Sequence, residues 1–266
     1  MLSVYLILII GGCLTGFLAG LLGIGGGIII VPILAFAFHI LPETTASYMQ
    51  YAAGTSLGIM IFTAISSIPH KLRQREVNFT IVKMFTPYIV FASILGAIVA
   101  RFLNPKLLAI FFALTLLTML VKMLFQKDHE LITPKRNSKR KSAFWGTMVG
   151  FKSGIFGLGG GIVIIPYIHS LGYSMRIAIG TSSLFTLIIA LVGSITFAIT
   201  GITDHNAVSW TLGYLYLPAI LLVAPTSMIF SKIGAKLSSK APLGLLKWIF
   251  LFILAFSAVK LLLTAI

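Results

Sequence analysis

The sequence predicts an all-α polytopic membrane protein made of two inverted-topology repeats, each a glycine-broken or hairpin helix element plus three transmembrane helices. Three observations predict this fold class. Apolar residues make up 58% of the chain and charged residues only 9%, whereas soluble domains carry about 25% charged residues. A glycine-rich motif occurs twice, and the basic residues are unevenly distributed among the loops.

The glycine motif opens each repeat, because the pattern that begins at Gly12 recurs in the same order from Gly146. Three of its glycines are four residues apart on one helix face, where small residues let two membrane helices approach closely. The run from Gly23 to Gly27 then interrupts the helix. The recurring positions are Gly12, Gly16, Gly20, Gly23, Gly25, Gly26, Gly27 and Pro32 in the first copy, and Gly146, Gly150, Gly154, Gly157, Gly159, Gly160, Gly161 and Pro166 in the second.

The first repeat is predicted to occupy residues 1–126. Residues 2–40 are apolar apart from the glycine break, and a helix rises about 1.5 Å per residue, so this segment is too long for one straight span. Two short helices are therefore expected, forming either a full hairpin or a re-entrant pair. Three spans follow, at about 46–68, at about 79–100 and from 107 to about 125, separated by a basic loop at 69–78 and a short turn at 101–106.

A basic linker at 127–142 joins the halves, and the second repeat is predicted at 143–266. The linker is interpreted as a solvated cytoplasmic connector, with binding to anionic lipid as the alternative. The second repeat follows the order of the first. Its elements are a glycine element at about 143–172, a helix from near Ala178, a loop at 201–206, a span at about 208–230, a basic turn with Lys232, Lys236 and Lys240, and a last span.

The positions of Lys and Arg select the topology. If each glycine element crosses the membrane once, the repeats are parallel and both faces are basic. If it crosses twice or not at all, the repeats are inverted and the basic residues collect on one face. Cytoplasmic loops are enriched in Lys and Arg, so we expect inverted repeats in the plasma membrane, with the linker cytoplasmic and both termini outside. That face collects Lys71, Arg73, Arg75, the linker, Arg176, Lys232, Lys236 and Lys240.

Several classes of chemistry lack the residues they need. The five acidic residues, Glu43, Glu76, Asp128, Glu130 and Asp204, all fall in predicted loops or at span ends, so no carboxylate pair is predicted within the membrane for a proton relay, a cation site or a hydrolase. The five histidines have no metal-ligand spacing, and the single cysteine excludes an intramolecular disulfide. We therefore expect no enzyme, metal or cofactor. The net charge of +15 is interpreted as a topology signal, with no nucleic-acid partner.

The remaining polar groups favour an anion. Amides at a glycine break and at the helix start that follows can bind anions without a charged side chain, and Thr-Ser pairs on the next helix add hydroxyls. Lys152 stands in the apolar second element, where it either contacts an anion or extends to the basic face. The alternative is a purely structural role, in which the glycines form a tight turn and pack helices together, and the Ser and Thr hydroxyls bond to the backbone. The candidate substrate-binding residues are Gly23, Gly25, Gly26, Gly27, Thr55, Ser56, Lys152, Gly157, Gly159, Gly160, Gly161, Thr181 and Ser182.

The twice-used pattern Gly-x-x-x-Gly-x-x-Gly-x-Gly-Gly-Gly followed by Pro, with Gly-Thr-Ser on the next helix, resembles the TauE/SafE-type sulfite exporter family, also called toluenesulfonate uptake permeases. Val77-Asn78-Phe79 and Val208-Ser209-Trp210 are similar to that family's short motif opening the third helix of each half, where the first usually carries Asp in place of Asn78. The resemblance implies a multipass permease for small sulfur-containing or organic anions such as sulfite, sulfonates or sulfoacetate.

These observations lead to one function hypothesis and three alternatives. The first is a secondary transporter that works by alternating access, with the substrate site between the repeats; its partners are a small anion, the bilayer and, as a further candidate, a coupling proton. The second is a passive anion channel of the same fold. A membrane sulfur-relay protein is weaker because Cys13 stands alone and its counterpart is Thr147. A membrane anchor would leave the duplicated break unexplained.

Overall fold

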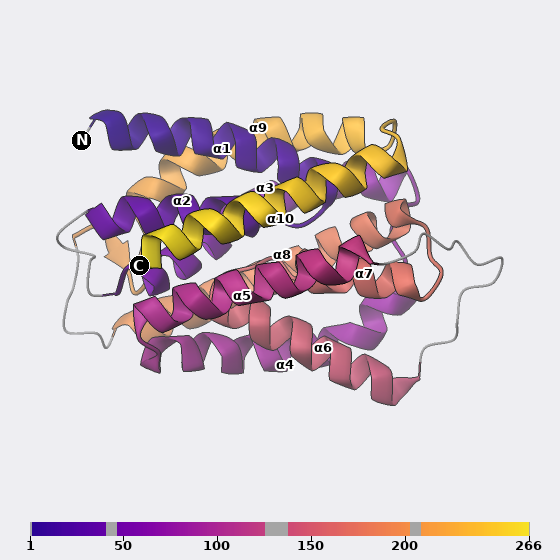
Figure 1. Cartoon of the computed structure of the whole chain (residues 1–266), viewed down its shortest axis with the longest axis horizontal. Helices are drawn as coiled ribbons and strands as arrows, with labels where there is room; N and C mark the ends of the chain where they lie inside the picture. The colour runs from indigo at the N-terminus through magenta and orange to yellow at the C-terminus, as the bar shows by residue number, and fades with distance from the viewer. Residues whose placement is uncertain (1, 41–46, 126–137, 203–208, 266) are drawn as a thin grey trace.

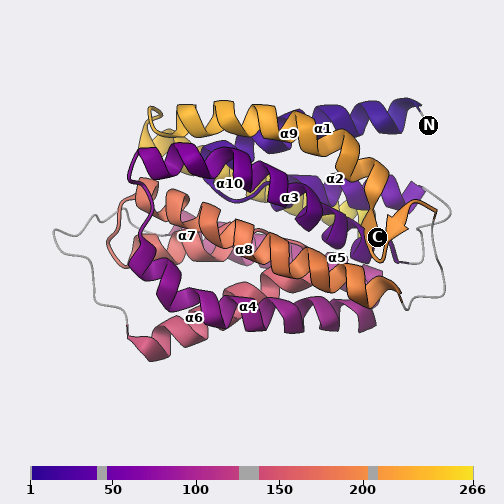
Figure 2. The same cartoon turned by 180° about the vertical axis from the view of Figure 1, so that it is seen from behind.

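The computed structural model describes residues 2–40, 47–125, 138–202 and 209–265. Its helices lie side by side in one elongated bundle, and Figures 1 and 2 show this bundle from opposite sides. In chain order the elements are α1 (Leu2–Leu22), α2 (Gly27–Ile40), α3 (Tyr48–Arg73), α4 (Phe79–Phe102), α5 (Pro105–Leu124), α6 (Lys139–Phe156), α7 (Gly161–Ser170), α8 (Met175–Ile202), β1 (Thr211–Leu212), β2 (Leu215–Tyr216), α9 (Leu217–Ser238) and α10 (Leu243–Ala265).

Each glycine element is a pair of helices joined at the glycine run. The first pair is α1 and α2, and the second is α6 and α7. The backbone between them takes positive φ angles, from +65° at Gly23 to +83° at Gly26 in the first break. Residues with a Cβ avoid this left-handed region, so the glycines are what permits the chain to reverse. The helix break predicted from the sequence is therefore confirmed, in both copies.

The two ends of the bundle differ in which parts of the chain they hold. Figure 1 shows that α1 begins and α10 ends at one end, the terminal end, whereas α5 ends and α6 begins at the other, the linker end. The α1–α2 pair opens toward the terminal end and the α6–α7 pair toward the linker end, in both views. Basic residues at the linker end include Lys71, Arg73, Arg75, Lys139, Arg140, Lys141, Arg176, Lys236 and Lys240.

The halves interlock through the glycine faces of α1 and α6. Helix α1 packs along α9, and α6 packs along α4, so each of these two helices contacts the opposite half. At Gly16, an added Cβ would collide with the Ser227 backbone of α9; at Gly150 it would collide with the Ile89 backbone of α4. The glycines four residues apart therefore permit close helix approach, as their spacing predicts. Helices α3 and α8 pack against each other at the centre.

Several predicted boundaries are wrong by one or more helical turns. Helix α3 continues through Pro69 to Arg73, because a proline is tolerated in a membrane helix where neighbours satisfy the freed backbone groups. The span expected from residue 208 begins only at Leu217, with Pro218 in its first turn. A short β-hairpin precedes it and turns at Gly213, where φ is +58°.

The basic turn and the linker also differ from expectation. Lys232 and Lys236 lie on α9, and the turn to α10 comes after them. Most of the predicted linker falls outside the described residues, but its last positions are helical, because α6 begins at Lys139 with the Ser138 side chain accepting a hydrogen bond from the Lys141 amide. The predicted start, at residue 46, of the span that corresponds to α3 lies outside the described residues. Positions 203–206 of the loop predicted at 201–206 also lie outside them.

Within the described residues, four helices are long and apolar enough to cross a membrane by length and composition: α3, α4, α8 and α9. Shorter apolar helices include most of α1, α2 and α5 and all of α7. Many large apolar side chains on the outer surface are exposed, including Phe91, Leu221 and Phe252. This surface suits a bilayer rather than water, because a soluble protein rarely exposes large continuous apolar patches. The chain is a polytopic helical membrane protein.

Candidate functional site

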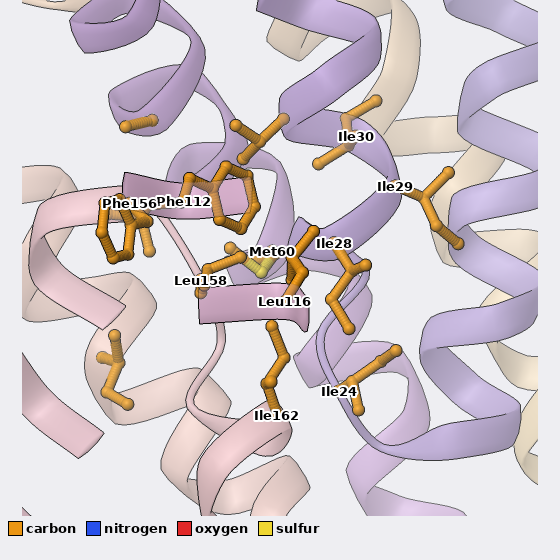
Figure 3. Close-up of a cluster of buried hydrophobic side chains, with 14 of the residues drawn as sticks. Ile24, Ile28, Ile29, Ile30, Met60, Phe112, Leu116, Phe156, Leu158 and Ile162 are labelled. Atoms are coloured by element: carbon orange, nitrogen blue, oxygen red, sulfur yellow. The ribbon is translucent and has the colours of Figure 1, made fainter. Parts of the chain in front are cut away.

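The two glycine breaks, which lie in opposite halves of the sequence, are in direct contact. A Cβ at Gly27 would lie 2.8 Å from the Gly157 carbonyl oxygen, and one at Gly161 would lie 2.6 Å from the Ile24 Cα. Figure 3 shows the apolar side chains around this contact, with Ile24 and Ile28 of the first element close to Leu158 and Ile162 of the second. The structure thus brings together the two glycine runs that the sequence marks as candidate binding residues.

Two helix N-termini converge at this contact. Helix α2 begins at Gly27 and α7 begins at Gly161. The first hydrogen bonds of α2 run from the Ile29 and Ile30 amides to the Gly26 carbonyl, and the same pattern opens α7 at Gly160. The amides that precede this ladder have no intrahelical acceptor, as at any helix start. The contact therefore joins the positive ends of two helix dipoles.

The serine of each Thr-Ser pair bonds to the glycine break of the other half. Ser56 on α3 donates a hydrogen bond of 2.8 Å to the Gly157 carbonyl, and Ser182 on α8 donates one of 2.6 Å to the Gly23 carbonyl. Both serines are fully buried. In this conformation each hydroxyl donates its proton to a backbone carbonyl. The two serines therefore help to hold the breaks in place.

The threonines make a second reciprocal exchange. The Thr55 hydroxyl accepts a hydrogen bond of 3.0 Å from the Tyr216 amide, just before α9. The Thr181 hydroxyl accepts one of 3.0 Å from the Asn78 amide, just before α4. The Asn78 side chain in turn accepts hydrogen bonds from the Thr80 and Ile81 amides and caps α4. The Thr-Ser pairs thus link each half to two segments of the other.

Two threonines beside the breaks were not predicted from the sequence. Thr186 on α8 donates to the Gly159 carbonyl. Thr15 on α1 is fully buried against Gly26, and its hydroxyl has no hydrogen-bond partner. A buried hydroxyl without a partner is costly and rare, and it calls for an explanation. A comparison of the two motif copies could have found Thr15. Its counterpart in the second copy is the apolar Val149, so the hydroxyl is present in one copy only.

Lys152 lies apart from the contact between the breaks. It is half-buried and lines a separate groove of about 470 Å³ between α4, α5 and α6, whose other lining residues are mostly apolar. Thr115 and Thr118 of α5 line the same groove. His169, the histidine of the second glycine element, is buried and hydrogen-bonded at 3.1 Å to the Tyr173 carbonyl. His169 is therefore a packed residue in this structure.

Comparisons with known proteins match the chain over nearly its whole length. A sequence model of the sulfite exporter TauE/SafE family matches residues 8–261. The chain is similar to a probable membrane transporter protein of Haemophilus influenzae, at 30% identity over 247 residues covering 93% of this chain and 94% of the relative. A probable membrane transporter protein of Methanocaldococcus jannaschii is 29% identical over 237 residues, covering 88% and 86% of the two chains. No solved structure matches the chain.

Proposed function

Because the chain belongs to the sulfite exporter TauE/SafE family, we propose that it is a secondary transporter moving a small oxoanion or sulfonate across the plasma membrane by alternating access. The observation that carries this proposal is the contact between the two glycine breaks, at which the N-termini of α2 and α7 converge. This contact is the proposed substrate site. The role is transport rather than catalysis.

The electrostatics of the contact favour an anion. Each helix N-terminus is equivalent to about half a positive charge, and backbone amides at such ends bind oxoanions directly. Thr15 packs its methyl group and its carbonyl oxygen against Gly26, and its buried, unpartnered hydroxyl is one further candidate donor near the break. The crevice that adjoins Gly25 is lined by hydroxyls and small residues and has no carboxylate among its lining residues. A cation would meet no compensating charge there.

The reciprocal contacts support the proposal that the halves are inverted repeats. Each half supplies a serine to the other half's break and a threonine to the segment before the other half's next-to-last helix. A two-fold axis lying in the membrane plane would produce such exchanged pairs, and transporters built on it move one repeat against the other around a fixed site. We assign the basic linker end to the cytoplasm and both termini to the outside.

Anion binding is the first test. Purified full-length protein in detergent is heated with sulfite, sulfate, thiosulfate, methanesulfonate or acetate, and the unfolding temperature is recorded. A ligand that binds only the folded state stabilises it by about 2.7 kcal/mol at a concentration 100 times its Kd. We expect a shift with at least one sulfur oxoanion or sulfonate and none with a potassium chloride control. No shift with any of these anions would contradict the proposed site.

Flux measurements separate the transporter from its alternatives. In proteoliposomes, a transporter moves the anion against its gradient when a proton gradient is imposed, and an uncoupler abolishes this uphill movement. A passive channel gives only downhill flux, which the uncoupler leaves unchanged. Cys13 lies half-buried on α1, and the variant Cys13→Ser is expected to retain flux. Loss of activity in that variant, with normal expression, would favour the sulfur-relay alternative.

A further inference from the structure

A buried ion pair closes the linker end of the bundle between the two halves. Lys71, near the end of α3, is 0% exposed and lies 3.2 Å from a carboxylate oxygen of Glu76. Its ammonium also donates a hydrogen bond of 2.6 Å to the Ser238 hydroxyl at the end of α9. Removing two charges from water is costly, so a fully buried lysine of this kind is unusual at a helix end, where it could otherwise reach water.

The charges of this cluster do not balance. Arg176, at the start of α8, has a buried Nε atom without a hydrogen-bond partner. The Glu76 carbonyl packs against Gly180, one turn along α8 from Arg176. The Glu76 oxygen nearest Lys71 also lacks a hydrogen bond of ordinary geometry. Among the residues that the structure describes, Glu76 is the one carboxylate beside the two cations Lys71 and Arg176, so this described part of the cluster carries an excess of positive charge.

A crevice with hydroxyls along its walls extends from the first glycine break along α3 and α8 toward the linker end. Its lining residues come from α1, α3 and α8 and from the break itself. On α3, Ser67 precedes Lys71 by one turn, and on α8, Ser183 follows Arg176 by two turns. Along either wall toward the linker end, the next charged residue is therefore a cation. The crevice is closed to a water-sized sphere in this conformation. Its lining residues are Ala19, Gly25, Thr63, Ala64, Ser67, Ser183 and Thr186.

The equivalent path toward the terminal end carries fewer hydroxyls, although the counterpart of Ala19 there is Ser153. Aligning Gly54-Thr55-Ser56 with Gly180-Thr181-Ser182 places Leu57, Ile189 and Gly193 where the crevice has Ser183, Thr63 and Ser67. The Leu57 side chain fills the space beside Gly193, where an added Cβ would lie 2.7 Å from it. At these three described positions, hydroxyls therefore line the side of the breaks that faces the linker end and are missing from the side that faces the terminal end.

We propose that Lys71 and Arg176 form an entry site for an anion at the linker end of this crevice, where an anionic group replaces the Glu76 carboxylate as the partner of Lys71. In the absence of the anion, the Lys71–Glu76 pair and the bond to Ser238 hold α3 and α9 together and keep the crevice closed. When the incoming anion replaces the Glu76 carboxylate, the crevice opens while the Lys71 ammonium keeps an anionic partner. This inference rests on the proposed transport function, because it supplies that function's access path.

The test measures the charge preference of the crevice directly. Ser67→Cys is introduced into full-length Cys13→Ser protein, and the thiol is reacted with a sulfonatoethyl or a trimethylammonioethyl methanethiosulfonate of similar size. We expect faster reaction with the sulfonate reagent. Glu76→Gln is expected to raise the rate with the sulfonate reagent by about tenfold, because one competing negative charge is removed close to the path. Lys232→Met, which removes an exposed lysine on α9, serves as the matched control.

A double variant guards against misfolding. Lys71→Met/Glu76→Gln removes both charges of the pair, which avoids leaving one buried charge alone, and it is expected to abolish the preference for the sulfonate reagent. Equal rates for both reagents in the parent protein, or an unchanged preference in the double variant, would overturn the entry site. The binding test of the proposed function uses the parent chain with free anions. If no free anion binds but the charge preference at Ser67→Cys remains, the proposed substrate is rejected. If an anion binds but the charge preference is absent, only the entry site is rejected.

Discussion

The Ser182 hydroxyl lies 2.6 Å from the Gly23 carbonyl oxygen and donates a hydrogen bond to it. A serine on α8 thereby satisfies a carbonyl that the broken end of α1 leaves without a helical partner. Ser56 and Gly157 repeat this relationship at 2.8 Å, with the roles of the halves exchanged. Each break thus has one of its carbonyls bonded by a serine that comes from the opposite half of the chain.

Ser182→Ala is expected to lower the free energy of unfolding by about 1–3 kcal/mol, because it leaves the buried Gly23 carbonyl without its partner. Ser56→Ala should have a similar effect at Gly157. Thermal unfolding of purified protein measures both. Ser170→Ala is the control, since Ser170 is exposed and surface substitutions change stability by about 0.5 kcal/mol or less. Unfolding temperatures equal to the control would show that these bonds contribute nothing.

Thr55→Val and Thr181→Val keep the shape of the side chain but remove the acceptor for the Tyr216 and Asn78 amides. Each is expected to cost about 1–3 kcal/mol of stability, the penalty of an unsatisfied buried donor. Hydrogen exchange at the Tyr216 and Asn78 amides provides the local measurement. The exposed Thr80 offers the comparison variant Thr80→Val. Unchanged protection of both amides would contradict this assignment.

Thr15→Val separates ligand binding from stability. Its hydroxyl is buried without a partner, so replacement by an isosteric apolar residue should leave stability unchanged or raise it by about 1 kcal/mol. If the hydroxyl donates to a bound anion, the Kd should rise about tenfold or more, since a bond to a charged group is worth about 1.5–3 kcal/mol. Titration calorimetry gives the Kd. An unchanged Kd would remove Thr15 from the proposed site.

Gly16→Ala tests the helix contact between α1 and α9. The added methyl group would collide with the Ser227 backbone, and overpacking of this kind costs about 1–3 kcal/mol. Gly244→Ala is the matched control, because nothing lies within 4 Å of the position where its Cβ would be. The two variants are compared by their yield of monodisperse protein and their unfolding temperature. Equal results would indicate that α1 can move away from α9 without cost.

The duplicated glycines made much of the fold predictable. Their spacing indicates both the helix contact at Gly16 and the break after Gly23, because glycine permits close approach and positive φ whatever its surroundings. Boundaries were harder to predict. The sequence predicts the end of a span before Pro69, but the helix continues for another turn, in which Lys71 meets its buried partners. Local sequence does not reveal such tertiary partners.

The candidate site was predictable only in part. The repeat marked both glycine runs as candidate binding residues, and the structure shows that they are in contact. The placement of Lys152 in a separate groove depends on the rotation of α6, which its sequence pattern does not fix. Glu76 is predicted to lie in a loop, and its ion pair with Lys71 depends on the turn after α3, where Arg75 takes a φ of +56°. Composition alone gives no sign of that turn.

The exchanged contacts also set an order of assembly during synthesis. In the described structure, the glycine face of α1 packs on α9, and the Gly23 carbonyl accepts its hydrogen bond from Ser182 on α8. Both partners are made after more than half of the chain has been translated. The first glycine hairpin therefore enters the bilayer before its partners in α8 and α9 have been synthesised, and a chain truncated before α8 would leave the glycine face of α1 and the Gly23 carbonyl without these partners.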